Sequence, residues 1–242
     1  MPNYYYDGSF DGLLTVVYMA YGDKNNGLRV IAEKEQFTLG LDDIHVTTDF
    51  SKARRVEKNI CEKISREFLN KMRTCFLSCD KNKDTAIVHT TYKAIKKGEE
   101  ILNSLDEHAF HMNKLIKQVL SERHKYLGVL RFKEMKDGTM FATIEPKNNV
   151  LPALISHFRN RMKRERFAIF DKEREMIAYY DMKKVEIFFV KSPEIEWSDE
   201  EMEYSELWKT FHKSISIKER ENRKLQQSNL PKYYWKHLVE EM

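Results

Sequence analysis

Cysteine and histidine pairs are the residues in this sequence whose spacing could bind a metal. Cys75 and Cys79 are four positions apart, so a helix would place both thiols on one face. His108 and His111 are three positions apart, which is also a helical spacing, and two acids precede them. A closed metal or cluster site needs more ligands than two, and no third ligand is obvious for either pair. We therefore interpret these residues as structural side chains and predict no metal and no cofactor.

Signatures of the common catalytic mechanisms are missing from the sequence. It has no Gly-rich loop for phosphates and no serine nucleophile at a sharp strand-to-helix turn. Among its 38 acidic residues, no spacing singles out a catalytic pair. The sequence supports no enzyme mechanism by itself, and whether the chain is an enzyme stays open.

A basic segment from His157 to Arg166 carries five permanent cations and a single acid, Glu165. The apolar residues before and within it recur at helical spacing, which predicts a helix from Asn149 to Glu165 with one buried side. Guanidinium groups on the other side could bind phosphates. The alternative is an ordinary solvated helix face. On the first interpretation, the nucleic-acid-binding residues are Arg131, His157, Arg159, Arg161, Lys163, Arg164 and Arg166.

Four polar residues lie within segments that are otherwise apolar: His124, Arg131, His157 and Arg161. If they converge, they form a cationic pocket that could hold a phosphate or an acidic group, with two histidines that can titrate near neutral pH. The alternative is that they satisfy buried carbonyl or carboxylate groups.

Charge is segregated along the last third of the chain. Residues 194–206 contain seven acids and no Lys or Arg, whereas residues 209–224 are mainly basic. The formal net charge of +4 is modest for a nucleic-acid-binding protein, so the distribution of charge matters more than its sum.

The elements that must position these residues are predicted for a sheet unit at about 124–191. A strand from Lys125 to Met135 turns at Asp137 and Gly138, because an Asp-Gly pair favours a tight hairpin, and returns over residues 139–145. The basic helix follows, and then strands at 167–171, 176–180 and 185–190. The fold class is α+β: an antiparallel sheet, with one face covered by a helix and the other free, packed with a helical block.

The helical block is predicted at about 50–123. Its first helix is capped by Thr48 or Asp49 and continues through Met72, the second is capped by Asp84, and the third covers about 105–123. Asp11 is expected to cap an earlier helix. After the sheet, Ser198 caps another helix. Pro231 opens a short terminal helix, whose residues up to Trp235 are expected to close the N-terminal helix or the sheet, or alternatively to dock another protein. Residues 1–242 are expected to form one domain, in which residues 27–50 have no assigned place.

Composition limits the environment in which the protein works. No stretch reaches the about 18 to 20 apolar residues that span a bilayer. The first residues lack the basic and then apolar profile of a signal peptide, and three cysteines cannot all pair internally. We therefore expect a cytoplasmic protein without a membrane partner.

An ordered series of residues extends along most of the chain. Near the start it comprises Tyr6, Asp7, Gly8, Ser9, Phe10, Gly12, Leu13 and Leu14. In the middle it comprises Glu122, His124, Gly128, Arg131, Phe132, Asp137, Gly138, Pro146, Val150, Leu151, Pro152, His157, Phe158 and Arg161. Near the end it comprises Leu207, Trp208, Glu219, Arg220, Asn222, Leu225, Gln226, Pro231, Tyr234, Trp235 and Leu238. In this series the chain resembles a family of uncharacterised bacterial probable DNA metabolism proteins.

The resemblance implies a role in DNA metabolism, because family members are paired with a radical-SAM protein of putative DNA-repair type. Some are fused to a uracil-DNA-glycosylase-like domain, which this sequence lacks. Our main hypothesis is an accessory DNA-binding protein that acts with the radical-SAM partner in DNA repair or modification. The alternatives are an enzyme acting on a nucleobase or nucleotide, and a protein-interaction scaffold without affinity for DNA.

Overall fold

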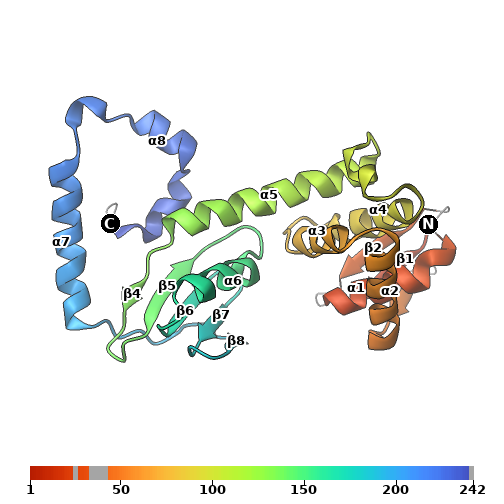
Figure 1. Ribbon diagram of the computed structural model, residues 1–242, viewed down its shortest axis with the longest axis horizontal. Helices are drawn as coiled ribbons and strands as arrows, with labels where there is room; N and C mark the ends of the chain where they lie inside the picture. The colour runs from red at the N-terminus through yellow and green to blue at the C-terminus, as the bar shows by residue number, and fades with distance from the viewer. Residues whose placement is uncertain (24–26, 33–42, 240–242) are drawn as a thin grey trace. The chain divides into compact units, whose positions relative to one another are not determined.

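The computed structural model describes residues 1–23, 27–32 and 43–239, which form two compact units, Met1–Leu120 and Ser121–Met242 (Figure 1). Helices make up 56% of the structure and each unit has its own sheet, which confirms the α+β class. The border between the units lies close to the predicted border between helical block and sheet unit. That both parts act as one domain stays a prediction.

The first unit contains a small parallel sheet with the strand order β2-β1-β3. Its strands are β1 (Asn3–Tyr6), β2 (Arg29–Ala32) and β3 (Asp43–Val46). Residues 27–50, which the sequence pattern does not place, thus supply two strands, and residues 33–42 lie outside the described part. In β1 the burial alternates, with Tyr4 and Tyr6 in the core, as expected for a strand with one covered face.

Helix α1 (Phe10–Met19) begins at Ser9, whose Oγ accepts a hydrogen bond from the Gly12 N–H at 2.9 Å. The predicted cap, Asp11, is wrong, because it already lies in the first turn, where an acid favours the helix dipole. Gly12 packs tightly: a Cβ at this position would lie 2.3 Å from Asp7 Oδ1 and 2.8 Å from Thr48 Oγ1. Only glycine fits at this approach of α1 to the loops after β1 and β3.

Three further helices belong to this unit: α2 (Phe50–Lys63), α3 (Arg66–Phe76) and α4 (Lys83–Lys97). Helix α4 packs on β2, α2 packs on α1, and α3 packs on α2 and α4. The predicted single helix through Met72 is interrupted, because Ser65 caps α3 by accepting from the Phe68 N–H at 2.8 Å. The expected apolar stripe is nevertheless buried in both parts. Asp84 does not cap α4, which follows Asn82; it lies buried in the first turn.

The buried carboxyl of Asp84 makes the first unit sensitive to pH. Its Oδ1 atom has no hydrogen-bond partner in the described structure, and burial raises the pKa from 3.8 to about 6. Because the pKa is higher in the folded than in the unfolded state, protonation of Asp84 stabilises the fold. This stabilisation is complete below pH 3.8 and is lost as the pH rises through about 6. We expect Asp84→Asn to be more stable than the wild type by about 3 kcal/mol at pH 7 and equally stable near pH 4. Urea unfolding followed by circular dichroism at both pH values tests this, and an equal gap at both values contradicts it.

Helix α5 (Glu107–Val129) contributes residues to both units. It extends six residues beyond the predicted end at 123, so the predicted strand from Lys125 is wrong. Tyr126 continues the buried face of the helix, and its carbonyl still accepts the Leu130 N–H at 3.0 Å. Only β4 (Lys133–Glu134) remains of that strand.

The second unit contains a five-stranded sheet in the order β4-β5-β6-β7-β8 (Figure 1). The other strands are β5 (Met140–Ile144), β6 (Phe167–Asp171), β7 (Met176–Tyr180) and β8 (Val185–Phe189). Three of the four pairs are antiparallel as predicted, and Gly138 makes the hairpin turn with φ of +76°. The pair β5–β6 is parallel, because α6 (Leu151–Arg161) crosses between them, and the sheet is therefore mixed.

Both faces of this sheet are covered at its centre, which corrects the expectation of a free face. Helix α6 packs on β6 and β7. On the other face, Phe141 and Phe170 join a cluster with Trp197 from the segment after β8. All five residues of β6 are therefore buried.

The chain then leaves the sheet as α7 (Asp199–Ile215), which Ser198 caps as predicted, and α8 (Arg223–Asn229). It returns through a short 3-10 helix, η4 (Lys232–His237), which follows Pro231. The buried ring of Tyr234 packs edge-on against Tyr126 at 5.0 Å, so this end packs on α5. Among the described residues, no helix is long and apolar enough to cross a membrane.

Candidate nucleic-acid interface

The cations of the basic segment all lie within residues 159–166, and the name is used below for these residues. They are divided between the end of α6 and the turn that follows it. The helix ends at Arg161 rather than at the predicted Glu165, and Met162 leaves helical geometry with φ of −111° and ψ of 49°. Leu151, Leu154, Ile155 and Phe158 are buried under the helix, as predicted. Arg159, Arg161, Lys163 and Arg164 are exposed, and Arg166 is half-buried.

Backbone and side-chain contacts fix this segment at the amino ends of β5 and β6. The Met140 N–H donates to the Arg166 carbonyl at 3.0 Å, and the Arg166 guanidinium donates to the Asp137 carbonyl in the hairpin turn. The Asp137 side chain accepts the Thr139 N–H at 2.9 Å, which is the main cause of its lowered pKa. These contacts hold the backbone that carries the exposed cations in a defined position.

The exposed cations are available to a polyanion. In the described part of the chain, no ion pair includes Arg159, Arg161, Lys163 or Arg164. Glu165 is the only acid among the residues from 159 to 166. Four unpaired cations within six residues can bind neighbouring phosphates, since each guanidinium presents a fork of donors.

The four residues of the predicted pocket occupy different surroundings. His124 is exposed on α5 and Arg161 is exposed at the end of α6. Arg131 is half-buried and donates to the Gly128 carbonyl at 3.2 Å. The half-buried ring of His157 meets Phe158 edge-on at 5.2 Å.

One contact brings two of these segments together. Phe132, next to Arg131, meets the ring of Phe158, next to His157, at 5.1 Å. This contact places the backbone segments of Arg131 and His157 near each other. A shared pocket, and with it an enzyme that acts on a nucleobase, stays a prediction.

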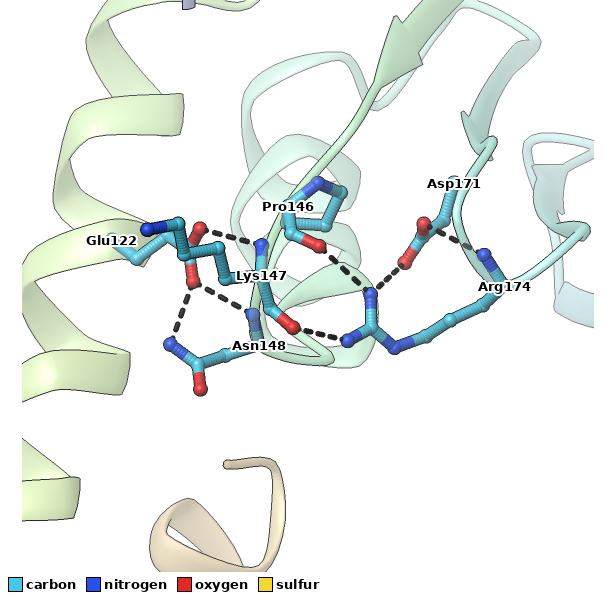
Figure 2. A network of polar contacts seen from close by, with 6 residues as sticks. All are labelled: Glu122, Pro146, Lys147, Asn148, Asp171 and Arg174. Carbon is cyan, nitrogen blue, oxygen red and sulfur yellow. Dashed lines mark hydrogen bonds and ion pairs between the residues drawn. The ribbon is translucent and has the colours of Figure 1, made fainter. Parts of the chain in front are cut away.

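A buried polar network lies at the opposite, carboxyl edge of the same strands (Figure 2). Glu122 on α5 is 6% exposed and accepts the N–H groups of Lys147 and Asn148 at 2.8 and 2.9 Å. The Asn148 amide donates to the same carboxylate at 2.7 Å. One carboxylate thereby holds the loop between β5 and α6.

Arg174 holds the same loop through its carbonyl groups (Figure 2). Its guanidinium donates to the carbonyls of Pro146 and Lys147 at 3.0 and 2.5 Å and to Asp171 Oδ2 at 3.0 Å. Asp171 ends β6 and is fully buried; burial raises its pKa, and Arg174 opposes that rise. We call Glu122, Asp171 and Arg174 the loop clamp.

The sequence analysis missed the function of the clamp residues, although signals existed. Asp171 ends a run of four apolar residues, which indicates that it is buried. Arg174 follows three residues later, where it can form an ion pair with this buried carboxylate. Glu122 carries no local signal, because its partners lie about 25 residues later in the sequence.

Glu145 ties the end of the chain to this edge. Its carboxylate accepts from Lys236 at 2.7 Å and lies near Lys172 and His237, at 3.6 and 3.3 Å. The Lys236 hydrogen bond is the main reason why the pKa of Glu145 is lowered. This cluster ties η4 to the end of β5.

The cysteines and histidines have structural surroundings in the first unit. Cys75 is buried, which raises its thiol pKa, and Cys79 is exposed. His108 stacks on His89 at 4.2 Å, and His111 lies 3.2 Å from Asp80. The described residues contain no group of three or more potential ligands that could hold a metal.

The fold and this interface define an α+β protein with two small sheets and a basic surface at one sheet edge. Residues 81–240 match the model of DUF4130, a domain of unknown function, which covers more than half of the chain. The chain therefore belongs to the DUF4130 family.

Other comparisons add little to this assignment. A search of the curated proteins finds no match. A solved structure titled a member of the s1p family of ribosomal proteins, with a DHH domain, is similar at 12% identity over 66% of this chain and 52% of its own length. Its TM-score of 0.24 is too low to support an argument about fold or function.

Proposed function

We propose that this protein is an accessory DNA-binding protein that acts with a radical-SAM enzyme in DNA repair or modification. The observation that carries the proposal is the set of exposed, unpaired cations of the basic segment at the amino edge of β5 and β6. The fixed geometry of the segment distinguishes it from a mobile charged tail.

The cations of the basic segment exceed what helix stability requires. Arg159 and Arg161 lie in the last turn of α6, where positive charge favours the helix dipole. Lys163 and Arg164 lie beyond the helix end, so this stabilisation does not account for them. Phosphate binding accounts for all four, and contacts to phosphates position a protein on DNA without reading its sequence.

The proposed partner rests on the resemblance of the chain to proteins paired with a radical-SAM protein. In this proposal the protein supplies affinity for DNA, and the partner supplies the reaction.

Combined substitution of Arg159, Arg161 and Lys163 by Ala tests the interface. We expect affinity for labelled duplex DNA to fall by roughly 10- to 100-fold at about 50 mM salt, because each lost phosphate contact removes a counterion-release contribution. The slope of log affinity against log salt should decrease by about 2 to 3. Fluorescence anisotropy across a salt series measures both quantities for single- and double-stranded DNA.

A charge-matched triple variant is the control. Arg54, Lys81 and Lys191 are exposed and do not lie at the amino edge of β5 and β6, and their replacement by Ala removes the same charge. This control should keep most of the affinity and slope. Equal losses in both variants, or no binding by the wild type at low salt, would exclude the basic segment as a DNA interface.

A second function, a protein-interaction scaffold, is favoured by the apolar surface of α7, which has no buried residue. Co-purification with the radical-SAM partner without any affinity for DNA would select this function over the first.

A further inference from the structure

The segment from 199 to 229 extends away from the sheet and has no hydrophobic core of its own. None of its described side chains is buried, although the chain on both sides of it is anchored, at Ser198 and at Tyr234 (Figure 1). Its large apolar side chains are 43% to 66% exposed. They are Met202, Tyr204, Leu207, Trp208, Phe211, Ile215, Ile217 and Leu225.

Five of these residues form one continuous face on α7. Tyr204, Trp208, Phe211 and Ile215 recur at intervals of four, three and four, and Leu207 lies beside them. We call these five residues the α7 stripe. The rings of Trp208 and Phe211 are in contact, at 5.9 Å. Met202 lies on the opposite side of the helix, by the same periodicity.

The α7 stripe needs a covering surface. A helix of 17 residues is marginal in water unless its apolar face is packed. At its first turn, α7 is held to the sheet by Glu201, which accepts the Glu134 N–H at 3.0 Å, but this contact leaves the side chains of the α7 stripe exposed. A contiguous exposed apolar face on a monomer marks an interaction site.

The charges of α7 indicate which partner fits. Its first half contains five acids and no cation: Asp199, Glu200, Glu201, Glu203 and Glu206. Its second half contains Lys209, His212 and Lys213 and no acid, and exposed Arg220, Arg223 and Lys224 follow. The helix is therefore charge-complementary to itself in the reverse direction.

We infer that α7 pairs with α7 of a second copy of this chain, antiparallel, about a two-fold axis between Leu207 and Trp208. This arrangement places the acidic half of each helix beside the basic half of the other helix, so the same set of charge contacts occurs twice. It also sets Tyr204 opposite Phe211. A parallel pair would place acids beside acids. Such a self-complementary contact is the usual form of a symmetric dimer.

Sedimentation equilibrium of the full chain tests the dimer. We expect a dimer that Leu207→Glu weakens by about 100-fold or more, because a charge would enter the centre of the apolar contact. The matched control is Met202→Glu, an equally apolar-to-acid change on the other side of the same helix, which should stay dimeric. Met202→Glu should keep the wild-type circular dichroism and melting temperature, whereas Leu207→Glu should stay folded and lose at most the helical signal of α7, whose apolar face is then unpacked.

Cysteine cross-linking tests the orientation, in a background with Cys79→Ser. Tyr204→Cys alone and Phe211→Cys alone should give little disulfide dimer, whereas an equal mixture of the two should cross-link efficiently. Cross-linking of Tyr204→Cys with itself would indicate a parallel pair and overturn the inference. A wild-type monomer at all concentrations, or a dimer that Leu207→Glu leaves intact, would also overturn it. DNA binding by a monomeric variant would leave the proposed function standing, so the two proposals can fail separately.

Discussion

Replacing Glu122 by Ala should lower the free energy of unfolding of the second unit by about 3 to 5 kcal/mol. The carboxylate accepts two backbone N–H groups and one amide from the loop between β5 and α6. Without it these donors lose this acceptor, and a buried donor left without a hydrogen bond costs about 1 to 3 kcal/mol. Urea unfolding followed by tryptophan fluorescence isolates this unit, because Trp197, Trp208 and Trp235 all belong to it.

Two further variants make the Glu122 result specific. Glu122→Gln keeps the shape but turns an amide N–H₂ toward a donor, so its loss should be smaller than that of Ala but still clear. Glu173→Ala removes an exposed acid near the same edge and should change stability by less than about 0.5 kcal/mol. Equal stability of Glu122→Ala and wild type would mean that the carboxylate does not hold the loop.

Replacing Arg174 by Met should cost about 3 to 5 kcal/mol at pH 7, because it leaves the carboxylate of Asp171 buried without its partner. Burial already raises the pKa of Asp171, and the loss of Arg174 should raise it further. For a carboxyl with a raised pKa, stability is present at low pH and is lost as pH rises. The deficit of this variant should therefore be largest at neutral pH and should shrink as the pH falls toward the usual range of Asp.

The charge explanation has its own controls. Asp171→Asn combined with Arg174→Met removes both charges, so the double variant should be more stable at pH 7 than Arg174→Met alone. Arg164→Met, which removes an exposed cation, should behave as the wild type. A deficit for Arg174→Met that is the same at pH 4.5 and pH 7 would rule out the buried carboxylate as its cause.

Local patterns in the sequence predict much of the second unit. The Asp137–Gly138 turn, the strands at β6 and β7, the Ser198 cap and the short helix after Pro231 all depend on neighbouring residues, and all are confirmed. The strand from Lys125 fails because tertiary burial of Tyr126 extends α5. The alternation of apolar residues near Leu130 does not reveal that burial.

Relations between distant residues are not predictable in this way. The parallel β1–β3 sheet and the parallel β5–β6 pair each depend on a crossover, and residues 27–50 have no strong periodicity. For the candidate interface, the sequence identifies the cations and the helix that carries the first two of them, Arg159 and Arg161. It does not show that they lie at the amino edge, nor that Glu122 and Arg174 hold the carboxyl edge. The sequence near a loop does not indicate at which edge of the sheet that loop will lie.

The parallel pairing of β5 with β6 also implies an order of folding. Strands β6, β7 and β8 are joined by short turns, so they can pair early, whereas β5 must wait for the closure of the longer segment that contains α6. We expect the loop clamp, which needs both α5 and the turn after β6, to close last. Its loss should then mainly speed unfolding, and a Glu122→Ala protein that folds slowly but unfolds at the wild-type rate would contradict this order. The carboxyl edge is therefore where the native state of this unit gains its kinetic persistence.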